Sequence, residues 1–352
     1  MKTWLRRIAL GVVALIVLAA LAGAGFERLS RADAAQSFPA PGRLVDVGDG
    51  RRLQIDCRGA GSPVVVFESG LDTLGALSWS KVHDAVARTT RACAYSRAGI
   101  MWSDTASGPF DARRAAQDLH NALATAGEAP PFVMVGHSLG GPYLLNFTGQ
   151  YGADVAGLVL VDASHPDQIA RLHNAIGRDL ASGAGLMKVG DSLAWSGAVR
   201  LLAPKGSFAP DHAPPRTVLA AGAWMPQSVH AAAREFGGLS QTLSVAGRNR
   251  RLGDRPLVVL TRTATAPPQA LKAMGVSADE GRRLDAEWRA MQEDEATWST
   301  HGRHQVVPGA SHYIQFDQPR VVIAAVEEVV GQVRAKAAES AAVRLGLSPP
   351  PS

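Results

Sequence analysis

The sequence is poor in cysteine and lacks any dense run of basic residues. Only 2 of its 352 residues are cysteine, and no Lys/Arg block interleaved with aromatic residues occurs, although the net charge is +5. Because nucleic-acid recognition relies on such basic patches, we expect no nucleic-acid partner. No internal repeat is visible. With 46% hydrophobic and 19% charged residues, the chain is long enough for one large domain that carries an insertion.

Residues 1–26 are typical of a targeting segment. Lys2, Arg6 and Arg7 precede an uncharged apolar run over residues 8–24. This run is long for the core of a signal peptide and just short for a membrane span, so a cleaved signal and a membrane anchor both remain open. Basic residues before such a run favour export of the chain that follows it.

Two groups of small residues suit signal cleavage: Ala22-Gly23-Ala24 at the end of the run and Ala32-Asp33-Ala34 after it. Lipidation is excluded there, because Ala24 stands where a lipoprotein signal requires cysteine. We therefore expect an exported protein: periplasmic, secreted, or anchored by this segment to the outer face of the cytoplasmic membrane.

Short apolar runs alternate with helical patterns through most of the remaining chain. Eight strand candidates, the first two joined as a hairpin, predict an α/β protein with a mostly parallel sheet and helices on both faces. The alternation breaks after residue 162 and resumes near residue 255. The predicted units are a linker (27–41), an α/β core (42–162 and 255–338), a mostly helical cap insertion (163–254) and a flexible tail (339–352).

The segment 132–141 combines a buried strand, a tight turn and the start of a helix. It reads Phe-Val-Met-Val followed by Gly136-His137-Ser138-Leu139-Gly140. A strand that ends in G-x-S-x-G and turns at once into a helix is the nucleophile elbow of serine hydrolases. The two glycines lack a Cβ and so remove clashes within the tight turn. We predict that Ser138 is the nucleophile; an incidental serine in a Gly-rich turn is the alternative.

A serine hydroxyl needs a base to accept its proton, and His312 is the best candidate. This histidine follows the last predicted strand, in Gly309-Ala310-Ser311-His312-Tyr313. The order nucleophile, acid, histidine along the chain is that of hydrolases with an elbow. We expect His137, within the elbow, to point away from the serine and to be structural.

The acid that should orient the histidine is harder to choose. The loop at residues 261–267, which follows a predicted core strand, contains no carboxylate. Asp162 ends the strand after the elbow helix, and we predict that it is the acid; capping of the following turn is its alternative role. Asp167 and Asp279 are reserve candidates, although capping of a helix start also explains Asp279.

Stabilisation of an oxyanion requires two backbone donors. One should be the N–H of Leu139, which follows the nucleophile. The other should come from the loop Glu68-Ser69-Gly70-Leu71-Asp72, and we choose Leu71. Gly70 would let this backbone approach the site closely.

These motifs resemble the α/β-hydrolase family over roughly residues 42–335. The elbow, the segment 160–166 and Ser311-His312-Tyr313 carry the resemblance. The chain is similar to a branch with Glu-Ser-Gly in place of His-Gly at the oxyanion loop. That branch often has Tyr-Asp-Arg-Ala-Gly where this chain has Tyr95-Ser96-Arg97-Ala98-Gly99, a departure that affects any local role of the aspartate. The resemblance implies an α/β-hydrolase fold with an eight-stranded sheet.

Two further expectations come from this resemblance. The family's usual acid follows the next-to-last core strand, which is the position that lacks a carboxylate here, whereas some lipases place the acid where Asp162 stands. Family topology also puts the second and fourth strands side by side, which would allow a disulfide between Cys57 and Cys93. Two buried free thiols are the alternative.

The residues favour an exported carboxylic-ester hydrolase that works through an acyl-serine intermediate on a small-molecule substrate. The serine at the elbow argues against haloalkane dehalogenase and epoxide hydrolase chemistry. Hydrolysis of amides, lactones or carbon–carbon bonds remains an alternative, as does a binding protein that kept the pocket without catalysis. We expect no cofactor and no metal ion.

Overall fold

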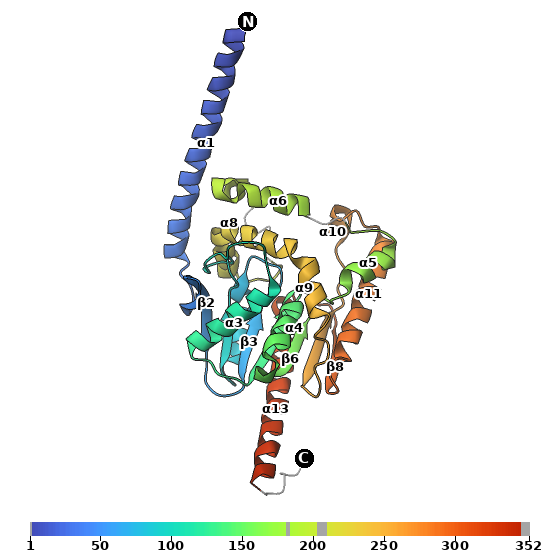
Figure 1. Cartoon of the computed structure of the whole chain (residues 1–352). Coiled ribbons are helices and arrows are strands. Elements are labelled where there is room, and N and C mark those ends of the chain that lie inside the picture. The colour runs from blue at the N-terminus through green and yellow to red at the C-terminus, as the bar shows by residue number, and fades with distance from the viewer. Residues whose placement is uncertain (1, 181–183, 203–209, 346–352) are drawn as a thin grey trace.

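The computed structural model describes residues 2–180, 184–202 and 210–345, and is built around an eight-stranded sheet (Figure 1). The strand order is β1-β2-β4-β3-β5-β6-β7-β8. β2 pairs antiparallel with β1 and β4, and the other pairings are parallel. The strands are β1 (Arg43–Gly48), β2 (Arg51–Arg58), β3 (Val64–Glu68), β4 (Ala92–Tyr95), β5 (Phe132–His137), β6 (Val155–Val161), β7 (Leu257–Arg262) and β8 (Gly302–Val307).

Helices cover both faces of this sheet. The helices are α1 (Lys2–Ser37), η1 (Gly75–Trp79), α2 (His83–Val86), α3 (Ala112–Ala126), α4 (Gly140–Tyr151), η2 (Gly152–Asp154), α5 (Gln168–Ile176), α6 (Ala184–Leu193), η3 (Ala194–Ser196), α7 (Ala198–Leu202), α8 (Pro215–Gly237), α9 (Leu239–Ala246), α10 (Pro268–Ala273), α11 (Ala278–Ala296), α12 (Ile314–Asp317) and α13 (Pro319–Arg344). The predicted α/β-hydrolase fold, with a mostly parallel eight-stranded sheet, is confirmed.

The core consists of two apolar layers, one on each face of the sheet. Successive side chains of a strand point to opposite faces, so Val66 of β3 belongs to the layer that includes α3 and α4, whereas Val65 and Phe67 belong to the layer that includes α13. This two-sided burial explains why β3, β5 and β6 are almost wholly apolar in sequence. The functional loops then follow the carboxyl ends of these strands.

Among the described residues of segment 163–254, the regular elements are α5, α6, η3, α7, α8 and α9, and no strand occurs. Its longest helix, α8, begins at Pro215, a residue type that suits the first turn because it has no N–H to leave unpaired. Figure 1 shows α6 and α8 lying together at one end of the sheet, and α5 lies against α11. This segment therefore forms a helical layer over one end of the core.

The predicted linker at residues 27–41 is wrong for residues 27–37. Among the described residues α1 alone is long and apolar enough to cross a membrane, and it continues as one helix to Ser37. Residues 27–37 are mostly Ala, Arg, Leu, Glu and Gln, and the first proline comes only at Pro39. These residue types favour a helix, and Ala34 is buried against the folded protein.

The predicted flexible tail at residues 339–352 is also wrong in part. α13 continues through the first six residues of that tail to Arg344, because the segment contains no Gly or Pro after Gly331 until Gly346. The proline-containing end of the chain, residues 346–352, lies outside the described residues.

Cys57 of β2 and Cys93 of β4 are direct partners in the antiparallel register between these strands. A disulfide joins them, with a separation of 36 residues along the chain. The pairing follows from the adjacency of the second and fourth strands, which the family resemblance implied.

Replacing both cysteines by alanine is expected to lower the free energy of unfolding by about 2–4 kcal/mol, because the crosslink restricts the unfolded chain. Urea denaturation of the double variant and of wild type, both without reductant, measures this difference. Thiol titration of the unfolded, unreduced wild type is the control. Two titratable thiols, together with equal unfolding curves, would contradict the disulfide.

Candidate active site

Ser138 occupies the sharp turn between β5 and α4. Its φ is +53°, a left-handed conformation that is strained for a residue with a side chain. A Cβ at Gly136 would lie 2.8 Å from the Leu144 side chain, and one at Gly140 would lie 2.6 Å from the carbonyl oxygen of Glu68. Both glycines are therefore required for this turn. This strand–turn–helix geometry is that of a nucleophile elbow.

Asp162 and His312 form a close hydrogen-bonded pair. The Nδ1–H of His312 donates to Oδ2 of Asp162 at 2.6 Å, although the residues lie 150 positions apart in the chain. Asp162 follows β6, and His312 lies in the loop between β8 and α12, so the carboxyl ends of two strands supply the pair. Asp162 is wholly buried and the His312 side chain is about one-third exposed.

Three further donors hold the Asp162 carboxylate. Oδ1 accepts from the Trp288 indole N–H at 3.0 Å and from the Arg262 backbone N–H at 3.1 Å. The Nε of Arg262 lies 3.3 Å from Oδ2. Burial alone would raise the pKa of Asp162, but the hydrogen bond and charge of His312 and the charge of Arg262 outweigh it. The pKa is therefore lowered, which keeps the carboxylate ionised.

Arg262 stands at the end of the next-to-last strand, where the family resemblance implied the usual acid. Arg262, at the end of β7, supplies donors to Asp162 instead of a carboxylate to the histidine. The reserve acids are engaged elsewhere: Asp167 pairs with Arg250, and Asp279 pairs with Arg282 on α11. Among the three predicted candidates, the structure brings only Asp162 to the histidine.

His137 links the histidine loop to the elbow. Its Nε2–H donates to the carbonyl oxygen of His312 at 2.8 Å, and the two rings lie 4.6 Å apart between centroids. Burial, together with the nearby His312, lowers the pKa of His137 to about 3, so the ring is neutral at physiological pH. Because His137 directly precedes Ser138, this contact holds the backbone of His312 next to the serine turn.

The loop after β3 lies directly against the serine. A Cβ at Gly70 would lie 2.8 Å from the Cβ of Ser138, so only glycine fits here. The next residue, Leu71, and Leu139, the N-cap of α4, are the predicted oxyanion donors. Among the hydrogen bonds of the described residues, neither the Leu71 nor the Leu139 backbone N–H serves as a donor. Neither N–H is therefore committed to a protein acceptor in that part of the chain.

Arg97 ties this loop to the helical layer. Its guanidinium donates to the carbonyl oxygens of Ser69 and Gly70 at 2.7 and 2.6 Å, and to Glu68 at 2.5 Å. It also makes a bidentate pair with Glu235 of α8, at 2.9 and 2.8 Å.

Every charged group of this cluster is almost fully buried. Tyr95 donates to Glu68, and Tyr143 donates to Glu235 at 3.2 Å. Burial raises the pKa of Glu68 to about 7, an effect that the charge of Arg97 opposes. Two carboxyl groups thus share one guanidinium, and the loop carrying Leu71 is fixed to α8 through Arg97.

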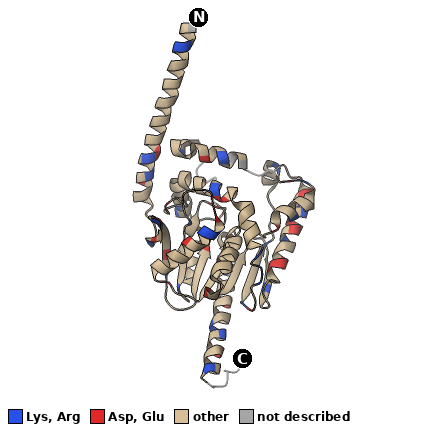
Figure 2. Ribbon diagram, viewed as in Figure 1, with Lys and Arg blue, Asp and Glu red and all other residues tan. Residues whose placement is uncertain are grey.

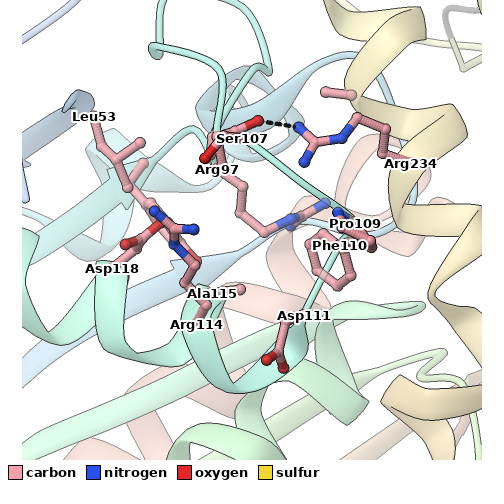
Figure 3. Close-up of a pocket in the computed structure, with 14 residues that line it drawn as sticks. Leu53, Arg97, Ser107, Pro109, Phe110, Asp111, Arg114, Ala115, Asp118 and Arg234 are labelled. Atoms are coloured by element: carbon pink, nitrogen blue, oxygen red, sulfur yellow. Dashed lines mark hydrogen bonds between the residues drawn. The ribbon is translucent and has the colours of Figure 1, made fainter. Parts of the chain in front are cut away.

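Two cavities lie near these groups. One, of about 440 Å³, opens beside His312 and is also lined by Tyr313, Trp288, Arg262 and the loop that includes Pro267. The other holds only about 30 Å³ and lies next to Arg97, between Phe110, Asp118 and Arg234 (Figure 3). A space of that size accommodates about one water molecule. Of these two cavities only the larger exceeds the size of a water molecule, and it reaches the site at His312, while Ser138 is not among its lining residues.

Comparison with known proteins agrees with this arrangement. The model of the alpha/beta hydrolase family matches residues 59–325, about three-quarters of the chain. The chain belongs to the alpha/beta hydrolase family. Among solved structures, this hydrolase is similar to a probable hydrolytic enzyme from Pseudomonas aeruginosa (18% identity, TM-score 0.63, 83% of this chain and 95% of that chain). It is also similar to a thermophilic esterase from Thermogutta terrifontis (21% identity, TM-score 0.54, 83% and 98%).

Likeness at these identities shows the fold alone. Among curated proteins, the hydrolase is similar to the probable transporter efuK of Hormonema carpetanum, with 34% identity over 34% of this chain and 18% of that protein. The matched segments of the first three curated relatives cover between 14% and 53% of their lengths. These relatives are therefore matched only in part.

Sequence reasoning missed three positions that the structure brings to the site. Trp288 and Arg262 hold the Asp162 carboxylate, and Glu235 pairs with Arg97. Arg97 and Glu68 stand in motifs that the sequence displays, but Glu235 lies 138 residues from Arg97 and has no local signal. Only the packing of α8 onto the hydrolase core reveals it.

Proposed function

We propose that the protein is an exported serine hydrolase that cleaves carboxylic esters through an acyl-serine intermediate. The observation that carries this proposal is the 2.6 Å hydrogen bond between His312 and the buried Asp162, with His312 tied through His137 to the turn that bears Ser138. A serine, a histidine and an ionised carboxylate are the groups that nucleophilic acyl transfer requires. Here His312 is hydrogen-bonded to Asp162, while the Ser138 hydroxyl makes no hydrogen bond to another described residue and is left free for the proposed attack.

In the proposed reaction, Nε2 of His312 accepts the proton of the Ser138 hydroxyl as its oxygen attacks the ester carbonyl. The oxyanion of the tetrahedral intermediate receives hydrogen bonds from the backbone N–H groups of Leu71 and Leu139. His312 then donates the proton to the leaving alcohol. A water molecule then transfers a proton to His312 and attacks the acyl-serine. His312 returns this proton to Oγ of Ser138 as the bond to the acyl group breaks and the acid leaves. Asp162 stabilises the imidazolium at both steps.

Several features favour this proposal over its alternatives. A serine at the elbow does not suit epoxide or haloalkane hydrolysis, in which the sequence pattern would have an aspartate. A binding protein without catalysis has no need of a lowered pKa at Asp162 or of free backbone N–H groups beside a strained serine. Amide, lactone and carbon–carbon substrates use the same groups, and a panel of esters, lactones and amides of matched acyl length distinguishes them.

Labelling with a fluorophosphonate probe tests the proposal directly. Folded wild-type protein is expected to become covalently labelled at Ser138, and mass spectrometry of the peptide containing residue 138 locates the adduct. Folded protein that remains unlabelled would contradict the serine-hydrolase assignment.

Arg97→Lys is expected to lower kcat about tenfold, with KM changed less. Lysine keeps the positive charge but cannot bind Glu235 in a bidentate manner while also donating to Ser69 and Gly70. The loop that carries Leu71 should therefore be less well ordered, which costs less than complete loss of an oxyanion donor, about 10²–10³-fold in kcat. Steady-state kinetics and near-UV circular dichroism measure the effect.

The matched control for Arg97→Lys is Arg303→Lys. Arg303 makes a similar bidentate pair with Glu328, but on the exposed surface. This variant is expected to retain wild-type kinetics. An unchanged kcat in Arg97→Lys would show that the cluster only stabilises the fold.

A further inference from the structure

The first part of α1 is a long, exposed apolar helix. Its residues from Thr3 to Ser37 include an 18-residue window with a mean hydropathy of 2.6, none of it buried. Figure 1 shows the first half of this helix projecting beyond α6 and the rest of the molecule. No charged residue occurs between Arg7 and Glu27, and the same bare stretch is visible in Figure 2. This part of α1 has no protein neighbour to cover it among the described residues.

The cap packs closely against α1 at the point where the apolar stretch ends. A Cβ at Gly23 would clash with the backbone carbonyl of Ser196 in η3, and one at Gly197 would lie 2.8 Å from the Phe26 ring. One turn further, Glu27 makes a bidentate pair with Arg200 of α7 at 3.0 and 2.8 Å. Both side chains of that pair are mostly buried. The junction is therefore tightly packed.

The end of α1 packs on the folded protein through one buried residue. Ala34 is buried in a cluster with Trp102 and Trp224, and both indole N–H groups donate to the carbonyl oxygen of Phe38, at 2.8 and 3.3 Å. A rigid connection thus runs from the apolar stretch into the cap.

The helices of the cap next to this junction expose large apolar side chains. α6, η3 and α7 pack against one another and against α8. Leu201 and Leu202 are 70% and 76% exposed, although polar residues normally occupy such positions in a water-soluble surface. We call the following exposed residues the cap apolar surface: Val189, Leu193, Trp195, Leu201, Leu202 and Leu219.

The position of the junction sets the depth of this surface relative to a membrane. At about 1.5 Å per residue, residues 3–26 of α1 extend about 36 Å. The hydrocarbon core of a bilayer is about 30 Å thick, so with Lys2, Arg6 and Arg7 on one side the opposite boundary falls near Gly23 and Phe26. η3 packs at that height, and its Trp195 is the residue type that accumulates at membrane interfaces.

We propose that α1 remains attached and that the cap apolar surface lies in the interface of the bilayer that α1 crosses. The cavity beside His312 is bordered by Pro210 and Asp211, which lead into α8, so it opens next to the same cap. The substrates are therefore esters of amphiphilic lipids that partition into the bilayer. This choice of substrate rests on the proposed function, whereas the contact with the bilayer does not.

Depth measurement by fluorescence tests the bilayer contact. Full-length Leu202→Cys is labelled with the environment-sensitive fluorophore NBD and reconstituted into phosphatidylcholine vesicles; the native cysteines are joined in the disulfide. The emission is expected to shift to the blue and to be quenched at least twofold by doxyl-labelled phosphatidylcholine. Glu339→Cys, exposed near the far end of α13, is the matched control and should show neither effect.

Two results would overturn the bilayer contact. One is equal quenching at residues 202 and 339. The other is a mature protein that begins after residue 24 or 34, found by N-terminal sequencing of the protein from its native membrane fraction.

Kinetics with two substrates test the lipid specificity. The double variant Leu201→Ser, Leu202→Ser should hydrolyse a water-soluble short-chain ester at the wild-type rate, but a long-chain ester embedded in vesicles about tenfold more slowly. If the double variant cleaved both substrates at the wild-type rate, the lipid substrate class would be overturned. Failure of wild type to cleave either ester would instead contradict the proposed function, and the fluorescence result would stand by itself.

Discussion

Ser138→Ala is expected to abolish measurable ester hydrolysis, with a decrease in kcat of about 10⁶-fold, because loss of the nucleophile from such a constellation removes the whole covalent pathway. The side chain of Ser138 makes no hydrogen bond with another described residue, so its removal should leave the fold unchanged. Steady-state kinetics on a chromogenic short-chain ester measure the loss. Thermal unfolding of the same preparation should agree with wild type within a few degrees.

A matched control is Ser340→Ala. Ser340 lies on α13, where its hydroxyl donates to the carbonyl oxygen of Lys336 on the exposed surface. Its substitution should leave kcat unchanged. Retention of wild-type activity by Ser138→Ala, after contamination by host esterases has been ruled out with the purified variant, would remove Ser138 from the mechanism.

The second large effect is expected for Asp162→Asn, with a decrease in kcat of about 10⁴-fold. In wild type, the N–H groups of Trp288 and Arg262 donate to Oδ1 of Asp162, and the asparagine oxygen can still accept from both. The amide nitrogen then faces Nδ1 of His312 and can only donate, so the imidazole takes the wrong tautomer and Nε2 carries a proton. It can no longer accept the proton of Ser138. Kinetics over a range of pH values measure the loss.

The two reserve carboxylates provide matched controls for this prediction. Asp167→Asn and Asp279→Asn each weaken an arginine pair at the surface. Exposed pairs contribute little to stability, so both variants should fold and retain kcat within about twofold. If Asp279→Asn or Asp167→Asn lost activity and Asp162→Asn did not, the acid would have been assigned wrongly.

Local features of the chain were predicted well because they depend on short-range sterics. The elbow at Ser138 requires glycines at two fixed positions, and a buried parallel strand requires an almost wholly apolar run, so both leave a clear pattern in the sequence. The eight-stranded sheet followed from the alternation of such runs with helices. The boundaries of α1 and α13 were the weakest part, since residues such as Ala, Arg and Glu fit an exposed helix as well as a linker or tail.

The sequence by itself determined the elbow, the order of Ser138, Asp162 and His312, and the class of fold, because each of these depends only on neighbouring residues or on order along the chain. Only the tertiary structure decided which carboxylate meets His312, that Arg262 and Trp288 hold it, and that Glu235 joins the oxyanion loop to the cap. Those contacts join residues at least 100 positions apart. Their formation depends on strand order and on how helices pack, which no local pattern encodes.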